Sequence, residues 1–204
     1  MLKYIRYDLK LIGDLIEPNS KVLDLGCGDG TLLEYLKKIK NVIPYGVEIE
    51  IKNIEKCIDK GVPVFQSDID EGLTDFQDNS FDYVILSQTL QVTKKPYKVL
   101  SEMLRVGKKC IISFPNFGYA PIRFYLLLKG KMPKLKFLPY EWYDTPNIHH
   151  LTIKDFYKFC NDHNIKIIKK IFLSYFKDKH IKIKLFPNFL SQYGLFVISK
   201  HATL

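Results

Sequence analysis

The fold of this chain is decided by the stretch Asp24-Leu25-Gly26-Cys27-Gly28-Asp29-Gly30. Residues 21–25, Lys-Val-Leu-Asp-Leu, lead into it and read as a short buried strand, and apolar residues at helical spacing follow it at residues 31–39, and together they predict a strand, a turn and a helix. In such a turn Gly26 permits unusual backbone angles, Gly28 lets the main chain approach a ligand, and Gly30 allows close packing at the helix start. The stretch is therefore typical of a turn that binds a nucleotide-like ligand.

Carboxylates follow the next two predicted strands. Glu48 ends the second strand, where its side chain can accept the hydroxyls of a ribose. Asp68 follows the third strand and can accept an adenine amino group. A nicotinamide-binding turn wants a third glycine where this chain has Thr31. The pattern therefore favours S-adenosylmethionine, or its product S-adenosylhomocysteine, over NAD.

We expect the cofactor-binding residues at the carboxyl ends of the strands. Asp24 is expected to orient the ammonium end of the cofactor, and the amides that begin the following helix to receive its carboxylate. A surface acid remains the alternative interpretation for Glu48, and a capped loop for Asp68. The predicted cofactor-binding residues are Asp24, Gly26, Cys27, Gly28, Gly30, Glu48, Ile49, Asp68, Ile69 and Ser87.

Strands and helices alternate along most of the chain, which predicts an α/β fold with a doubly wound, mostly parallel, seven-stranded sheet. This is the Rossmann-like architecture of class I methyltransferases. A segment rich in proline and aromatic residues, approximately 115–150, reads as an inserted loop and helical region after the fifth strand. The predicted strands are 21–25, 42–48, 62–66, 81–87, 110–114, 165–172 and 195–199, and the predicted helices are 7–16, 31–39, 51–60, 96–105 and 152–163.

The bulk properties fit one domain over residues 1–204, because the chain is long enough to bury a substantial core. No apolar run approaches the roughly 18 residues of a membrane span, and the first residues lack the apolar segment of a signal peptide. We therefore expect a cytoplasmic protein without a membrane partner. The four cysteines are too widely spaced for a metal site or a redox pair, so we expect reduced thiols and no metal.

Charge is distributed unevenly along the chain. Residues 1–90 carry 10 basic and 16 acidic side chains, a net charge of −6, and residues 91–204 carry 21 and 6, a net charge of +15. The acidic half suits a cationic sulfonium cofactor. The basic half either faces an acidic partner or is an ordinary solvated lysine surface. Arginine, the preferred residue for phosphate and base contacts, is scarce, which counts against nucleic acid as a partner.

Further motifs resemble a known family. They lie in residues 22–33, 45–49, 61–64, 80–91, 113–118 and 143–149. Together they resemble the MetW family of methionine-biosynthesis proteins over nearly the whole chain. The resemblance implies a methyltransferase-like fold and a role in methionine synthesis beside homoserine O-acetyltransferase. It implies no particular methyl acceptor, and the lysine-rich segment Lys177 to Lys184 departs from the family pattern.

Methyl transfer needs an in-line nucleophile and often a base, and the sequence identifies neither, so the catalytic residues stay unassigned. The segment 87–91 after the fourth strand holds no Asn-Pro-Pro-Tyr or Pro-Cys motif. An aromatic group in the insertion can line a substrate pocket or belong to a core and lid. The candidates for orienting a substrate or acting as a base are Gln88, Gln91, Asn116, His149 and His150. Capping, turn or packing roles are the alternatives for these five residues. The aromatic group is Tyr140, Trp142 and Tyr143.

Three functions are compatible with these features. The first is a methyltransferase that uses S-adenosylmethionine to methylate a small molecule. The second is an accessory partner of homoserine O-acetyltransferase that binds S-adenosylmethionine or S-adenosylhomocysteine without catalysis. The third, methylation of nucleic acid, is disfavoured by the scarcity of arginine. The apolar run at residues 124–128 is a place where a partner subunit can pack.

Overall fold

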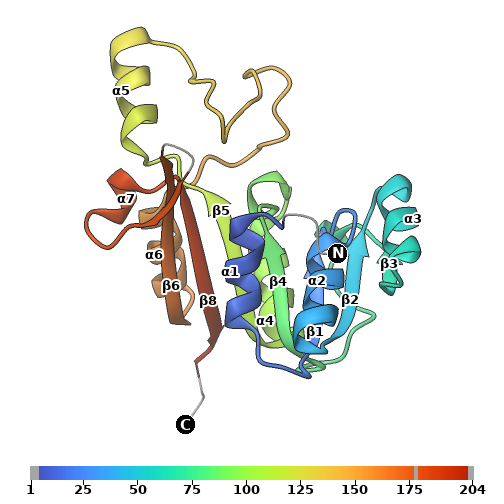
Figure 1. Ribbon diagram of the computed structural model, residues 1–204. Helices are drawn as coiled ribbons and strands as arrows, with labels where there is room; N and C mark the ends of the chain where they lie inside the picture. Colours follow the sequence, from blue (N-terminus) through green and yellow to red (C-terminus); the bar gives the residue numbers. More distant parts are fainter. Residues whose placement is uncertain (1–4, 177–178, 202–204) are drawn as a thin grey trace. The chain divides into compact units, whose positions relative to one another are not determined.

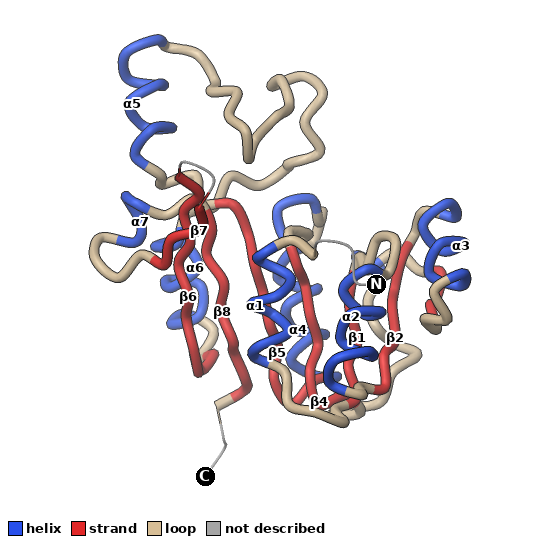
Figure 2. The backbone as a smooth tube through the Cα atoms, viewed as in Figure 1, coloured by secondary structure: helices blue, strands red, loops and turns tan. Residues whose placement is uncertain are grey.

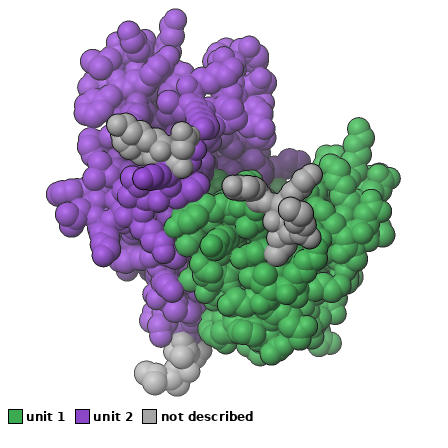
Figure 3. Space-filling view, viewed as in Figure 1, with its two compact units in different colours: residues 1–89, 95–111 green, residues 90–94, 112–204 purple. Residues whose placement is uncertain are grey.

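Figure 1 shows the computed structural model, which describes residues 5–176 and 179–201. The chain forms two compact units, coloured separately in Figure 3: unit 1 comprises residues 1–89 and 95–111, and unit 2 comprises residues 90–94 and 112–204. Strand β5, Gly107–Pro115, contributes its first residues to unit 1 and its last to unit 2. A single domain over the whole chain stays a prediction.

Unit 1 alternates strands and helices as the apolar pattern predicts. Its short 3-10 helix is η1 (Ile69–Glu71). Helices α1 and α2 cover one face of the strands and α4 covers the other (Figure 2). The strands are β1 (Lys21–Leu25), β2 (Ile43–Glu48), β3 (Val64–Gln66) and β4 (Phe81–Ser87), and the helices are α1 (Tyr7–Leu15), α2 (Thr31–Lys40), α3 (Ile51–Asp59) and α4 (Pro96–Val106).

The strand register of unit 1 brings several carboxyl ends to one edge of the sheet. Strand β1 pairs in parallel with both β2 and β4, so that Asp24 lies opposite Gly46 on one side and Ile85 on the other. Strand β2 pairs in parallel with β3, with Glu48 opposite Gln66. Because neighbouring parallel strands end together, the loops that follow them share this edge.

Apolar side chains on both faces of the strands form the core of unit 1. Leu23 and Leu25 on β1, Leu33 on α2 and Met103 on α4 are fully buried. Parallel strands that are covered on both faces are rich in apolar residues on both sides, and this is why residues 21–25 and 81–87 are recognisable from the sequence despite the polar side chains that each contains.

Unit 2 is mainly antiparallel and aromatic. Strand β6 pairs antiparallel with both β8 and β7. The ring of Phe196 on β8 stacks on Phe114 at 5.8 Å and contacts Phe156 at 4.7 Å. The elements are η2 (Leu90–Val92), α5 (Ala120–Lys129), α6 (Ile153–Asp162), β6 (Ile165–Phe176), β7 (Lys179–Lys182), α7 (Pro187–Leu190) and β8 (Tyr193–Lys200).

Helix α6 begins where the sequence predicts. Thr152 Oγ1 accepts a hydrogen bond from the Asp155 backbone N–H at 3.2 Å, and the Asp155 carboxylate accepts one from the Thr152 backbone N–H at 2.9 Å. This reciprocal capping box satisfies two of the amides that a helix start leaves without partners. The inserted segment between β5 and α6 contains one long helix, α5, and a loop.

The sheet has eight strands in the described part of the chain, rather than the seven predicted. Their order is β3-β2-β1-β4-β5-β8-β6-β7. The additional strand is β7, whose four residues are all exposed. It lies at the edge of the sheet. Charged residues are common in edge strands, and because all four side chains are exposed, the sequence has no apolar alternation that would predict a strand. Lys177 and Asp178, which begin the lysine-rich segment, lie outside the described residues.

Within residues 5–176 and 179–201, no helix combines the length and the apolar character that crossing a membrane requires. The same ranges contain no group of three or more histidine, cysteine, aspartate or glutamate side chains arranged to hold a metal ion.

Candidate functional site

The three glycines of the turn have different roles in unit 1. All three adopt left-handed backbone angles, with φ of +67° at Gly26, +56° at Gly28 and +74° at Gly30. A β-carbon on Gly26 would lie 3.0 Å from Thr89, and one on Gly30 would lie 2.9 Å from the Cys57 sulfur. A β-carbon on Gly28 would meet no atom within 4 Å. Gly26 and Gly30 are thus required by packing, whereas Gly28 borders open space that a ligand can enter.

The Glu48 carboxylate is held in place by the backbone. It accepts hydrogen bonds from the N–H groups of Gly28 (2.8 Å), Ile49 (2.9 Å) and Glu50 (3.0 Å), and its side chain is buried. A carboxylate offers about four acceptor sites, so these three bonds leave about one for a ligand. Accepting two ligand hydroxyls would require the Gly28 N–H to release its bond.

Asp24 is the least satisfied polar group of the turn. It is buried, and its oxygen Oδ1 has no hydrogen-bond partner among the described residues. Burial, and to a lesser extent the nearby charge of Glu48, raises the pKa of the Asp24 carboxyl to about 8. A buried carboxyl in this state gains free energy from a cation that restores its charge.

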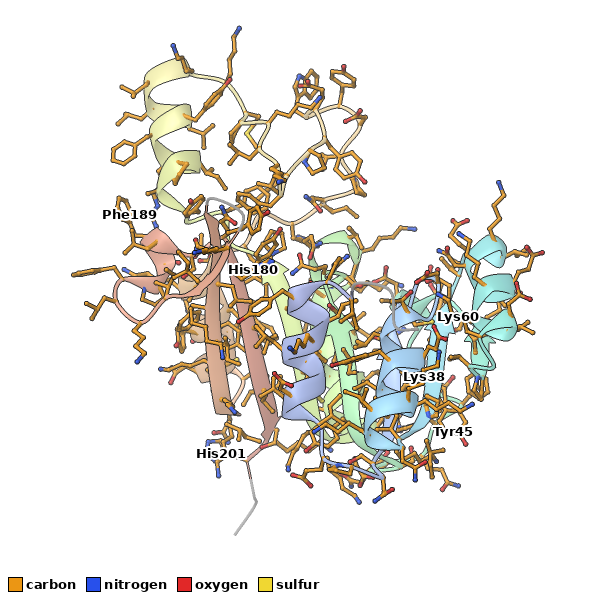
Figure 4. All side chains as sticks on the ribbon, viewed as in Figure 1. Lys38, Tyr45, Lys60, His180, Phe189 and His201 are labelled. Atoms are coloured by element: carbon orange, nitrogen blue, oxygen red, sulfur yellow. The ribbon has the colours of Figure 1, made fainter. Side chains whose placement is uncertain are left out.

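The lysine that directly follows α3 holds Asp29 and Thr31 of the turn in place. Lys60, labelled in Figure 4, donates hydrogen bonds to the Asp29 carbonyl and carboxylate, both at 2.7 Å, and to Thr31 Oγ1 at 2.9 Å. Burial opposes ionisation of Asp29, but the hydrogen bonds from Lys60 and Thr31 outweigh it and lower the pKa of this carboxyl. Asp29 Oδ1 also accepts the Thr31 backbone N–H at 3.2 Å, so this amide at the start of α2 already has a partner.

Two thiols fill the space beneath the turn. The sulfur of Cys27 lies 3.8 Å from that of Cys57, which in turn donates to the Gly28 carbonyl at 3.2 Å. Burial is the main cause that raises the pKa of both thiols, so they stay protonated. Gly46 is required opposite them, because a β-carbon there would lie 2.5 Å from the Cys27 sulfur.

The other predicted cofactor-binding residues lie at the same edge of unit 1. Asp68 is half-buried and its Oδ1 caps η1 by accepting the Asp70 N–H at 2.9 Å. Ile69 is half-buried and Ile49 is exposed. Ser87 ends β4, and its carbonyl accepts the Thr89 hydroxyl at 3.1 Å. The structure therefore brings the predicted set together in one unit.

Gln88, which follows Ser87, has a left-handed backbone with φ of +56°. Residues other than glycine rarely adopt this conformation, and such strain is concentrated at functional sites. The strained residue stands directly after a strand whose carboxyl end belongs to the candidate site, so it positions the loop that leaves the sheet there.

Asn116, in unit 2, has a structural role. Its amide nitrogen donates to the carbonyls of Asn188 (3.1 Å) and Ser191 (2.8 Å), and its amide oxygen accepts the N–H groups of Gly118 (3.0 Å) and Ile153 (3.2 Å). All four hydrogen-bonding positions of the amide are filled. The side chain thus ties the end of β5 to α6, to α7 and to the residue that follows α7.

The remaining candidates also lie in unit 2. The carbonyl of Gln91 accepts the N–H groups of Ile148 (2.8 Å) and His149 (3.0 Å). His149 Nε2 is buried without a hydrogen-bond partner among the described residues. Burial, together with His149, lowers the pKa of His150.

The inserted segment lines an open pocket of about 270 Å³. Tyr140, Trp142 and His150 line it, and the His150 ring contacts Phe117 at 4.4 Å. Tyr143 and His149 are not among the lining residues. The aromatic group predicted as a substrate pocket therefore lines a cavity only in part.

Sequence reasoning missed four residues that shape the turn: Gly46, Cys57, Lys60 and Thr89. Cys57 and Lys60 reach the turn from α3, about 30 residues away in the sequence, and no local motif signals such contacts. Gly46 carries a usable signal, because a glycine inside a buried strand indicates that another group approaches the backbone closely.

Comparison with known proteins identifies relatives. The sequence model of one protein family, described as "Methionine biosynthesis protein MetW", matches residues 6–198. A "Bifunctional methionine biosynthesis protein MetXA/MetW" from Rhodopirellula baltica is 36% identical over 178 residues, which cover 82% of this chain and 28% of that protein. The chain spans less than half the length of the curated relatives it matches.

Solved structures share the fold at low sequence identity. A SAM-dependent methyltransferase from Thermotoga maritima superposes with a TM-score of 0.70 and 17% identity, covering 95% of this chain and 87% of that one. Magnesium protoporphyrin IX methyltransferase from Synechocystis PCC 6803, solved with bound SAH, gives a TM-score of 0.63 and 16% identity, covering 94% and 79%. The predicted fold is therefore confirmed: the chain has the α/β fold of class I methyltransferases, with a mostly parallel sheet.

Proposed function

The chain belongs to the MetW family of methionine-biosynthesis proteins, and from this premise we propose that unit 1 binds S-adenosylmethionine or S-adenosylhomocysteine at the glycine turn. The proposed ligand contacts come from Asp24, Gly26, Cys27, Gly28 and Gly30 on the turn, and from Glu48, Ile49, Asp68, Ile69 and Ser87 on the neighbouring strand ends.

The unpartnered Asp24 carboxylate oxygen carries this proposal. Its burial is unfavourable unless a donor or a cation reaches it. Both S-adenosyl compounds bear an ammonium group that supplies charge and hydrogen-bond donors together. The turn of unit 1 thus has the chemistry that the amino-acid end of these ligands requires.

The nucleoside end fits the remaining residues. Open space at Gly28 lets the ligand approach the backbone, and Glu48 retains about one acceptor site for a ribose hydroxyl. Asp68 and Ile69 would then face the adenine, the first by accepting its amino group and the second by packing on its face.

When bound, S-adenosylmethionine supplies an electrophilic methyl group, and we propose that the chain transfers it to a small molecule in the cytoplasm. In this reaction the named residues of unit 1 would bind and orient the cofactor. No residue is assigned as the base or the nucleophile, and nucleic acid is not proposed as the acceptor because arginine is scarce.

A second candidate function is favoured by the bifunctional relative. Its name joins MetXA to MetW in one polypeptide, which supports a physical partnership between this chain and homoserine O-acetyltransferase. In that role the S-adenosyl ligand would report the supply of methionine, from which it is made, and no methyl transfer would be needed.

Two measurements test these functions. Calorimetry with S-adenosylmethionine and S-adenosylhomocysteine is expected to give dissociation constants in the micromolar range or below, and absence of binding to both would overturn the cofactor proposal. Acetylation of homoserine by the acetyltransferase is then measured with and without this protein. An unchanged rate, together with failure of the two proteins to associate, would overturn the accessory function.

A further inference from the structure

Helix α5 in unit 2 exposes a run of large apolar side chains. Leu127 is 77% exposed, Leu128 76% and Phe124 52%, and Met132 beyond the helix is also exposed. Only Ala120 and Ile122, in its first turn, are buried. Large contiguous apolar patches on a protein surface mark places where another molecule binds.

The base of α5 is firmly attached. Arg123 donates to the Gly118 carbonyl at 2.5 Å and its guanidinium lies 5.5 Å from the Phe189 ring, which is labelled in Figure 4. Phe124 contacts the same ring at 6.1 Å. The helix is thus held at one end against α7, and its outer turn is presented to whatever binds there.

Apolar side chains surround the outer part of α5. The residues 124–128 are five consecutive large apolar residues, all exposed. Successive residues are about 100° apart around a helix, so these five cover its whole circumference. A helix that lies on a lipid surface has one apolar and one charged face. A helix that is apolar all round is normally buried in protein, so these residues suit a partner surface that covers more than one side of the helix.

The charge around α5 is predominantly positive, and the next acid in the sequence, Glu141, pairs with Lys134 at 3.1 Å. Residues 116–140 contain five basic side chains, Arg123, Lys129, Lys131, Lys134 and Lys136, and no acidic one. Two copies of this surface would bring like charges together, which disfavours a second copy of the chain as the occupant. A partner with carboxylates around an apolar groove would match both the charge and the apolar residues.

We propose that the outer turn of α5 docks into an apolar groove with an acidic rim on a partner protein, and that this partner is the acetyltransferase of the proposed function. The inference rests on that partnership and adds the surface that forms it. Leu127 and Leu128 would enter the groove, and Lys129 and Lys131 would face the carboxylates at its rim.

The test measures binding of the full chain to homoserine O-acetyltransferase from the same organism by calorimetry. A Leu127→Ser/Leu128→Ser double variant is expected to weaken binding at least about 30-fold, since buried apolar anchors dominate interfaces. Ile58→Ser is the control, because Ile58 on α3 is 64% exposed and lies in unit 1. It is expected to leave the affinity within about twofold.

A second pair of variants tests the acidic rim. Lys129→Glu/Lys131→Glu is expected to weaken binding about tenfold or more and to flatten its dependence on salt. Lys52→Glu/Lys56→Glu on α3 makes the same change of charge elsewhere and is expected to have a small effect. All variants should retain binding of S-adenosylhomocysteine, which shows that unit 1 is folded.

The outcomes separate the two proposals. If the wild-type chain binds the acetyltransferase and the leucine variant binds equally well, the α5 surface is wrong and the partnership stands. If the wild-type chain does not bind, the partnership and the surface both fail, whereas the cofactor site is untouched. Two further outcomes overturn the α5 proposal. In both, the leucine variant still binds the enzyme, but it loses either self-association in sedimentation or binding to phosphatidylglycerol vesicles.

Discussion

The glycine turn of unit 1 and helix α5 of unit 2 depart from ordinary burial in opposite directions. In the turn, an oxygen of Asp24 is buried without a partner, whereas on α5 the side chains of Leu127 and Leu128 are exposed. Burying an unpartnered polar group costs free energy, and exposing a large apolar one forgoes the stabilisation of burial. A molecule from outside the chain that reaches either place would relieve the departure there.

The two regions differ in the kind of molecule they suit. The turn offers one enclosed acceptor and space at one glycine, which matches a small cationic ligand. Helix α5 offers a broad apolar surface in a strongly basic segment, which matches a protein. The net charge of −6 over residues 1–90 favours a cationic ligand in that half, and the net charge of +15 over residues 91–204 favours an acidic partner. The two proposed recognition surfaces of this chain therefore differ in physical character, one being a polar enclosed site and the other an apolar exposed one.

The sharpest way to break this comparison is Gly28→Val. Valine would fill the open space at Gly28 with two methyl groups, and we expect loss of S-adenosylmethionine binding by at least about 100-fold in calorimetry. Gly130→Val is the matched control, because Gly130 also has a left-handed backbone, with φ of +60°, and open space around its β-carbon position. Both variants carry similar backbone strain, about 1–2 kcal/mol. Equal loss of ligand binding in both would contradict the role of Gly28.

Removal of the Glu48 carboxylate should have the next largest effect. We expect Glu48→Ala to weaken binding of S-adenosylhomocysteine by about 1–3 kcal/mol, because a charged hydrogen-bond acceptor is lost and three backbone N–H groups lose their partner. Glu50→Ala, which removes an exposed neighbouring carboxylate, is the control. An affinity unchanged by Glu48→Ala would exclude this residue from the site.

Protonation of Asp24 gives a third prediction. Its pKa of about 8 in the ligand-free fold means that binding of an ammonium group below this pH must release a proton. Between pH 5.5 and 7 the affinity should therefore rise with pH, by up to about tenfold per unit. Calorimetry in two buffers of different ionisation enthalpy counts the protons. Equal heats in both buffers, or an unchanged slope in Asp24→Asn, would contradict the assignment.

The same shift has a consequence for stability. The unfolded chain loses the Asp24 proton near the usual aspartate value of about 3.9, whereas the folded chain keeps it up to about pH 8. The folded state is thus favoured fully below pH 4, and this contribution is lost as the pH rises toward 8. In Asp24→Asn the free energy of unfolding should no longer fall between pH 5 and pH 7 for this reason. Denaturant unfolding at the two pH values measures the difference.

The smallest expected effect concerns Lys60. Lys60→Ala removes three hydrogen bonds to Asp29 and Thr31, but the ion pair is partly exposed, so we expect a loss of about 0.5–1 kcal/mol in unfolding free energy. Ligand affinity should fall about twofold to fivefold as the turn loosens. Lys38→Ala, which breaks an exposed pair with Glu34, should change stability less and affinity not at all. If Lys38→Ala lowered stability or affinity more than Lys60→Ala, the hydrogen bonds of Lys60 would not be what orders the turn.

Much of unit 1 was predictable because its structure follows local rules. Residues 83–86 form an apolar core within 81–87, as expected of a strand covered on both faces, and residues 81–87 form β4 with the predicted bounds. Residues 31–39 place their leucines on one face and form α2. Strand β7 was missed because an exposed edge strand of lysine, histidine and isoleucine has no such pattern.

The sequence by itself determined the strand–turn–helix unit, the mostly parallel character of the sheet and the residues that gather at its edge, because backbone preference and apolar periodicity are properties of neighbouring residues. Only the tertiary structure decided which glycine faces open space, that Asp24 has an oxygen without a partner, and that Lys60 and Cys57 reach the turn. It alone decided that residues 124–128 stay exposed. Each of these depends on contacts between segments far apart in the chain, and burial there is set by what packs against a residue rather than by the residue itself.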